Sequence, residues 1–550
     1  MPAWCGIFLA LLLILLAVGR GSLFRDPGVF WHTAFGQQIL RGEGIPRVDA
    51  HSITFNGVRW LDLQWLGECA MALAYNCGGW DSVLLLGAAV LAATYAWLGQ
   101  RLLATGMHVI PCCVLLGLVL TASSHHFHVR PHLVSIWLLG MTVATLVDIE
   151  RGKRSIWSLA WLTPLFALWS NIHGGVLGGL ATAGITVTGW SFLSLLGQES
   201  PLKTVRGRVL ASALMASAAL ALLATPHGWG GMHTCLRLMS MPLPEVIQEH
   251  RSLSLFRVEG IAVVLLGFAY IATLRTVGTR QWRVTWVLPF VWLALAFLRV
   301  RHAPLFAIVW GVVMADAISR SRAKLWLAQH GLWAEESTTL SRTADSKHTK
   351  PAHSEPNRIR ARYGVLVAFI PVVLALALQI GNMRVPLLGK NWARLSAAGW
   401  PMALADDLVM LQTAKGRPLR LLNQLHYGGF VILHSPKTQV FIDDRCELYG
   451  FAFLSEYALA EASEPHRIRG WQVRHKFDAA LVTSGSAFDV FLSREPGWKR
   501  LTADGSAVLY LSEASPTEPA ERSSSPQQPS GGFKASERYP IAVPLAQTAP

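Results

Sequence analysis

The chain has 550 residues, of which 52% are hydrophobic and only 15% are charged, and its mean hydropathy is +0.37. Soluble globular proteins carry about 25% charged residues, so this composition excludes an ordinary soluble protein and predicts an integral membrane protein. The formal net charge is +15. The lysines and arginines lie between apolar runs, where membrane topology explains them, and no nucleic-acid partner is expected.

The first predicted element is an apolar helix over residues 3–20. It lacks the basic start and the small-residue cleavage site of a signal peptide, so we expect a retained transmembrane helix. A large first outer loop over residues 21–79 follows it. The end of this loop, residues 63–79, contains Gln64 and Glu68 and is predicted to be an interfacial or re-entrant helix.

Apolar runs long enough to cross a bilayer, about 17 to 25 residues each, predict about eleven spans and a mainly α, polytopic helical membrane protein. The runs cover residues 3–20, 80–103, 108–124, 131–148, 156–171, 174–196, 209–225, 259–275, 284–299, 303–319 and 363–381. With a cytoplasmic N-terminus, every inner loop is basic, as the positive-inside rule requires. If residues 63–79 also crossed the membrane, all later loops would change sides, and the inner loops would no longer be the basic ones.

The sequence divides into five regions. Residues 1–320 are expected to form one transmembrane domain, and residues 321–362 a polar cytoplasmic linker before the last span at 363–381. Residues 390–512 predict a small extracytoplasmic α/β domain with strands at RLLNQ, FVILHS, QVFID, AALVTS and SAVLYLS. Residues 516–550 are rich in Ser, Pro, Glu and Gln and are expected to be disordered.

Unusual polar motifs gather on the side opposite to the basic loops. The first loop supplies acids and histidines, and later outer loops supply SSHHFHVRP, NIHGG, TPHGW and RVRHAP. Ionisable groups at membrane depth are costly and usually mark a functional cavity. Carboxylates can activate a hydroxyl or bind a divalent cation, and guanidinium groups pair with phosphate. The pattern predicts a site for an anionic, lipid-linked substrate at the outer leaflet.

Several of these motifs resemble those of a known family. The stretch RDPGVFWHTAFGQQILRGEGIPRVDAHSITFNGVRWLDLQWL, residues 25–66, is similar to the first loop of a family of largely uncharacterised bacterial polytopic membrane proteins. The likeness continues in RPHL, WSNIHGG, TPHGW, RVRHAPLF and NQLHYGGFVILHSPKTQVFIDDRCELYG, in the same order. That family resembles the GT-C glycosyltransferases, which include protein mannosyltransferases and the lipid A aminoarabinose transferase.

The resemblance implies a multi-pass glycosyltransferase of the inner (plasma) membrane, with membrane lipid and a polyprenyl-phosphate-linked sugar as partners. The sugar would pass from the polyprenyl phosphate to an extracytoplasmic acceptor. The candidate catalytic residues are Asp26, as the first-loop acid, with His32 and His173. The candidate substrate-binding residues are Arg130, Arg299, Arg301, Asn171 and Asp49. Metal ligands are not assigned, and a divalent cation stays open as a cofactor.

Two positions depart from the family pattern. The second acid of the family's Asp-Pro-Asp motif is Gly28 here, and the acid of a frequent His-Glu-Trp-Leu motif is Gln64. These departures weaken the case for a two-carboxylate metal site and leave a single-acid mechanism open. They also leave open a non-catalytic assembly or scaffold protein, beside a transporter of lipid-linked substrates.

Simpler structural interpretations compete at each motif. Asp26 precedes a proline, and Asp-Pro is a good turn or helix cap. Tryptophans of the first loop suit interfacial anchors, and the histidines of SSHHFHVRP suit a polar interfacial turn. Asp443, Asp444 and Arg445 follow a predicted strand, where a local salt bridge or turn is expected rather than an active site.

Overall fold

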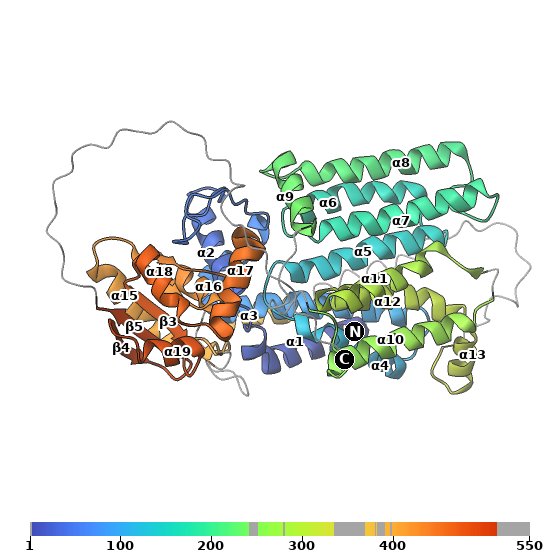
Figure 1. The fold of residues 1–550 in the computed structure, drawn as a ribbon. Coiled ribbons are helices and arrows are strands. Elements are labelled where there is room, and N and C mark those ends of the chain that lie inside the picture. The colour runs from blue at the N-terminus through green and yellow to red at the C-terminus, as the bar shows by residue number, and fades with distance from the viewer. Residues whose placement is uncertain are drawn as a thin grey trace, which may run out of the picture. The chain divides into compact units, whose positions relative to one another are not determined.

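The computed structural model describes residues 3–240, 251–278, 281–334, 369–379, 381, 391–396 and 399–513 (Figure 1). Within these residues, eight helices are long and apolar enough to cross a membrane, and three shorter apolar helices accompany them. Together they coincide with the eleven runs predicted from the sequence, which confirms the helical membrane fold. The predicted tail and most of the predicted linker lie outside the described residues.

The apolar helices are named here in chain order, and several are lengthened by a short 3-10 turn. The long ones are α1 (Ala3–Ser22), α3 (Trp65–Leu103), α4 (Val109–Ser123), α5 (His132–Glu150), α7 (Val176–Leu195), α8 (Val205–Leu220), α10 (Val258–Arg275) and α12 (Ala303–Ser319). The shorter ones are α6 (Leu162–Ser170), α11 (Leu288–Leu298) and the helix Phe369–Gln379. The remaining helices of this part are α2 (Gly28–Leu40), α9 (Gly228–Ser240) and α13 (Arg322–Gln329).

Helix α3 is broken near its first third. Gly78 and Gly79 leave the helical conformation, and Gly79 has a φ of 60°, which an L side chain rarely adopts. The break separates residues 65–77 from the span that begins at residue 80, where the sequence predicted a boundary. The first piece packs against α2, and Gly36 of α2 lies directly on the backbone of Glu68.

Helix α12 lies at the centre of the bundle. It packs against α3, α4, α5, α10 and α11, and its residues from Phe306 to Ile318 are all buried. Because its neighbours surround it, this helix holds them in one arrangement. At its C-terminal end Asp316 pairs with Arg151 and Arg283, and nearby Arg101 pairs with Asp148. The basic helix ends that the sequence assigned to the cytoplasm therefore come together at one end of the bundle.

The C-terminal part is an α/β domain around a five-stranded sheet of order β2-β1-β3-β5-β4. The strands are β1 (Leu419–Asn423), β2 (Thr438–Val440), β3 (Ala479–Thr483), β4 (Trp498–Ala503) and β5 (Ala507–Ser512). β2, β1 and β3 are parallel, whereas β3, β5 and β4 are antiparallel. The helices are α15 (Ala405–Ala414), α16 (Gly428–His434), α17 (Cys446–Ala462), α18 (Arg467–His475) and α19 (Ala487–Leu492).

One predicted strand is wrong. The sequence FVILHS was expected to be a strand, but Phe430 to His434 belong to helix α16. A short apolar run is compatible with a buried helix as well as with a strand, and the elements that pack against it determine which of the two forms. Here Gly429 lets the helix approach α2 closely, Gly428 lies against Ile442 and Asp443, and Figure 1 shows α2 beside α16.

The first loop joins this domain at the free edge of β2. The Val440 N–H donates to the His51 carbonyl at 2.9 Å, and the Ile53 N–H donates to the Val440 carbonyl at 2.8 Å. The Trp60 indole N–H donates to Glu447 at 2.9 Å, and that of Trp400 donates to the Phe24 carbonyl at 2.6 Å. The loop thus extends the sheet and shares one core with the domain.

Candidate functional site

Asp26 begins the turn into α2 and is only 8% exposed. One carboxylate oxygen accepts the Gly28 N–H at 2.8 Å, as an Asp-Pro turn requires. The other accepts Nη1 of Arg130 at 3.0 Å, from the turn just before α5. Asp26 therefore makes the turn expected of a structural residue and also holds an arginine across the site.

The residues around this pair lower the pKa of Asp26 and leave room for the Arg130 guanidinium. Burial raises the pKa of Asp26, but attraction by Arg130 and His128, together with the Gly28 hydrogen bond, lowers it below its usual value. Gly28 leaves the space that the guanidinium fills, because a Cβ there would lie 2.8 Å from Asp26 Oδ1 and 2.9 Å from Arg130 Nε. The missing family acid at Gly28 thus makes room for the arginine.

His32 forms a second, fully buried polar cluster beside this pair. Its Nδ1 lies 2.8 Å from Oε1 of Glu68, and neither side chain is exposed. Burial lowers the pKa of His32, and the nearby charge of Arg130 lowers it further. Burial also raises the pKa of Asp62, an effect that a hydrogen bond to the Glu68 side chain partly offsets.

His173 lies in the turn between α6 and α7 and is held in one orientation. Its Nδ1 accepts the Gly175 N–H at 3.0 Å and lies 2.9 Å from the Ser135 hydroxyl. Since Nδ1 is an acceptor, the neutral ring carries its proton on Nε2. Burial and the neighbouring His132 and Arg130 lower the pKa of His173 to about 3, so the ring is neutral at physiological pH.

Two predicted binding residues are committed to protein partners. The Asn171 amide donates to the carbonyls of Ala167 and Ala224 at 2.8 Å and accepts the Trp65 indole N–H at 2.8 Å. Asp49 is 1% exposed and is bonded to Ser52 and Arg445. Both residues fix the first loop in place rather than present a free polar atom.

The other predicted arginines lie at the same end of the bundle. Arg301 belongs to the short turn between α11 and α12, and its charge contributes to the lowered pKa of His173. Arg299 ends α11 in the same turn. The structure thus brings Asp26, Arg130, His32, His173 and Arg301 to one region. Residues 241–250, which follow the outer-loop motif TPHGW in the chain, lie outside the described residues.

The sequence interpretation missed Asp444, which the C-terminal domain brings to this region. Burial raises its pKa well above the usual value, and repulsion by Asp26 raises it further, while Arg130 opposes this rise. Within the described residues, Asp444 Oδ1 and the indole nitrogen of Trp31 are buried and complete no hydrogen bond of normal geometry, but the indole N–H faces the Asp444 carboxyl and lowers its pKa. Only the acid-rich motif FIDDR pointed to this residue, and nothing in it distinguished Asp444 from Asp443.

The two neighbours of Asp444 anchor it from both sides. Arg445 Nη2 donates to Asp443 and to Asp49 of the first loop, both at 2.7 Å. The Tyr449 hydroxyl donates to Asp443 at 2.8 Å, and the guanidinium lies over the Trp60 ring. The predicted local salt bridge is therefore present between Asp443 and Arg445, but it also ties the domain to the first loop.

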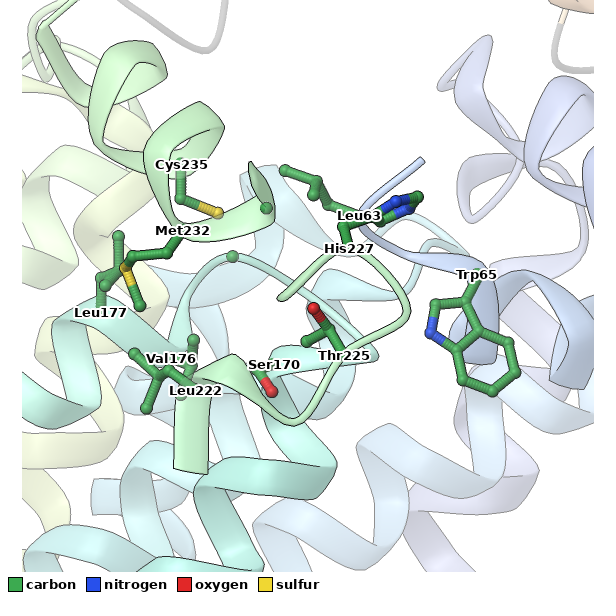
Figure 2. Close-up of a pocket in the computed structure, with 12 residues that line it drawn as sticks. Leu63, Trp65, Ser170, Val176, Leu177, Leu222, Thr225, His227, Met232 and Cys235 are labelled. Atoms are coloured by element: carbon green, nitrogen blue, oxygen red, sulfur yellow. The ribbon is translucent and has the colours of Figure 1, made fainter. Parts of the chain in front are cut away.

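An apolar pocket adjoins His173. It is lined by Leu63, Trp65, Ser170, Gly174, Val176, Leu177, Leu222, Thr225, His227, Gly231, Met232 and Cys235. Figure 2 shows Leu177, Val176 and Met232 on one side and Trp65 on the other. His227 is fixed by a 2.7 Å contact of its Nε2 with the Asp62 carbonyl. The pocket is thus mainly apolar and small, with an enclosed volume of about 20 Å³.

A divalent cation does not fit the described part of this site. Among the described residues, no three His, Cys, Asp or Glu side chains could hold one ion together. Both oxygens of Asp26 already accept from N–H donors.

Comparison with known proteins supports the fold. Protein-family models and curated proteins gave no match to the sequence. The oligosaccharyltransferase AglB from Archaeoglobus fulgidus, in complex with an inhibitory peptide and a dolichol-phosphate, matches with a TM-score of 0.52 at 10% identity, over 88% of this chain and 69% of that chain. ArnT from Cupriavidus metallidurans bound to undecaprenyl phosphate matches with a TM-score of 0.49 at 14% identity, over 94% of this chain and 99% of that chain. The likeness to AglB confirms the fold that the resemblance to GT-C glycosyltransferases implied.

Proposed function

We propose that this chain is a membrane glycosyltransferase that moves a sugar from a polyprenyl-phosphate donor to an acceptor outside the cytoplasm. The observation that carries the proposal is the partly buried Asp26–Arg130 pair, at 3.0 Å, where the first loop meets the outer ends of the helices. The fold supports it, because AglB has this fold and its structure contains a dolichol-phosphate.

In this proposal the donor phosphate binds at Arg130 and Arg301. A guanidinium offers paired N–H donors that match phosphate oxygens. As the bond between sugar and phosphate breaks, negative charge builds on the leaving phosphate, and preorganised cations stabilise it. Asp26 holds Arg130 in place and, as a carboxylate, stabilises the positive charge that develops on the sugar.

The histidines and the pocket complete the proposed arrangement. His173 is neutral, with its proton on Nε2, so it serves as a hydrogen-bond donor to the substrate rather than as a fixed cation. The small pocket beside it is mainly apolar, and its lining would have to widen to take the first isoprenoid units of the donor. Asn171 and Asp49 contribute by positioning the loop over this site.

The test is sugar transfer by the purified full chain in detergent, with a panel of polyprenyl-phosphate sugars. We expect acceptor-dependent release of polyprenyl phosphate, abolished in Arg130→Gln. Arg469→Gln is the matched control, because Arg469 pairs with Glu495 on the exposed face of the C-terminal domain. Movement of intact lipid-linked sugar across liposomes without bond cleavage would instead identify a transporter, and neither activity would favour an assembly protein.

A further inference from the structure

We propose that Asp444 is a catalytic residue of this site, the base that accepts the proton of the acceptor hydroxyl, and that the C-terminal domain must dock on the first loop to deliver it. This inference rests on the proposed function and adds to it a second carboxylate that the membrane domain alone does not contain.

The geometry that places Asp444 is built from both sides of the junction. Residues 51–53 pair with β2, and the chain reaches Asp444 four residues after Val440. In helix α16, which precedes β2 in the chain, Gly429 lies very close to α2. A Cβ at Gly429 would lie 2.6 Å from the Pro27 carbonyl and 3.1 Å from Trp31. The turn carrying Asp444 is therefore fixed beside the turn carrying Asp26.

The hydrogen bonds that anchor this junction do not involve the Asp444 carboxyl. Asp443 is bonded to Arg445 and Tyr449, and Arg445 to Asp49, so these side chains serve the junction. Asp444 Oδ1 is buried and completes no hydrogen bond of normal geometry within the described residues. The indole N–H of Trp31, which is 2% exposed, faces the same carboxyl and lowers its pKa. Buried polar atoms without partners are costly, and a bound substrate would supply the partner.

The proposed step forms one bond to the sugar and breaks another. The acceptor oxygen forms a bond to the anomeric carbon of the sugar, while the bond from that carbon to the phosphate oxygen breaks. The electron pair of the broken bond leaves with the phosphate, which Arg130 holds. The proton of the acceptor hydroxyl passes to the Asp444 carboxylate.

The charges around Asp444 suit a base. The groups that face it are Asp26, Arg130, Asp443 and the Trp31 indole. Arg130 keeps Asp26 ionised, and the resulting negative charge raises the proton affinity of Asp444. A carboxylate with a raised pKa accepts a proton more readily than an ordinary one, whereas the lowered pKa of Asp26 makes it a poor base.

The experiment compares Asp444→Asn and Asp444→Glu with Asp478→Asn in the purified full chain. Asp478 is a buried carboxylate of the same domain that pairs with Arg417 and Lys415, which lower its pKa. We measure sugar transfer against pH, binding of farnesyl phosphate as a soluble isoprenoid phosphate, and the melting temperature.

Asp444→Asn is expected to lower transfer by about a hundredfold, to leave farnesyl phosphate binding intact, and to keep or raise the melting temperature. The folded pKa of Asp444 is raised, so its contribution to stability is present at low pH and is lost as pH rises through that pKa. Wild-type transfer should rise with pH through the same range, and Asp444→Glu should restore part of it. Asp478→Asn should lower the melting temperature while the folded fraction keeps its transfer rate.

The outcomes separate the two proposals. If the wild-type chain transfers no sugar from any donor, the proposed function fails and the role of Asp444 fails with it. If the wild-type chain transfers sugar and Asp444→Asn retains the rate and its pH profile, only the role of Asp444 is overturned. A lowered melting temperature with an unchanged rate per folded molecule would make Asp444 a structural residue.

Discussion

Arg445 is a fully buried arginine that holds two buried carboxylates, Asp443 and Asp49. We predict that Arg445→Met lowers the free energy of unfolding by about 3–5 kcal/mol, because breaking a buried ion pair leaves its partners uncompensated. The melting temperature of the purified chain measures this. Arg469→Met, which removes an exposed arginine, should leave the melting temperature unchanged, and equal effects of the two changes would refute the anchoring role of Arg445.

Asp26 offers a second prediction for a single residue. Asp26→Asn removes the charge but keeps an oxygen for the Gly28 N–H, and asparagine serves turns and caps nearly as well as aspartate. Transfer should fall by at least about a hundredfold if the charge acts on the reacting groups. Near-normal transfer with normal folding would reduce Asp26 to a turn residue.

At the scale of elements, the contact between α16 and α2 depends on Gly429. We predict that Gly429→Ala lowers both the melting temperature and transfer, because the new Cβ would lie 2.6 Å from the Pro27 carbonyl and push α16 away from α2. Gly470→Ala in α18 is the control, since no atom lies within 4 Å of its added Cβ. Alanine in a helix interior is about 0.5–1 kcal/mol better than glycine, so this control should be slightly stabilised.

The elements show what one sequence can and cannot predict. The apolar runs located the spans because a bilayer demands about 20 apolar residues in a row. The boundary before residue 80 was predicted from Gln64 and Glu68 in the preceding segment, whereas the two glycines that break α3 there were seen only in the structure. The segment FVILHS was misassigned because its conformation is decided by α2, about 400 residues earlier in the chain. Asp26, His32 and His173 were visible as polar residues in apolar surroundings. Asp444 was not, because its neighbours Asp26 and Arg130 come from other parts of the chain.

For the whole molecule, the testable quantity is its orientation in the membrane. The basic helix ends around Asp316 and the site around Asp26 lie at opposite ends of the helices, and the positive-inside rule assigns the former to the cytoplasm. We therefore predict that reporter fusions after residue 389 are active only when the reporter works outside the cytoplasm. Activity of a cytoplasm-only reporter at that position would reverse the assignment.

The junction between the first loop and the C-terminal domain also sets an order of events during synthesis. Asp49 and Arg445 are 396 residues apart in the chain. At about 5–20 residues per second, the ribosome needs roughly 20–80 s to supply the partner of a loop that has already left it. Through that interval Asp49 lacks its Arg445 partner, and Trp60 lacks its contacts with the C-terminal domain. On the proposed role of Asp444, a nascent chain that has made all its spans would still lack its base, so the last-made segment would determine when transfer begins.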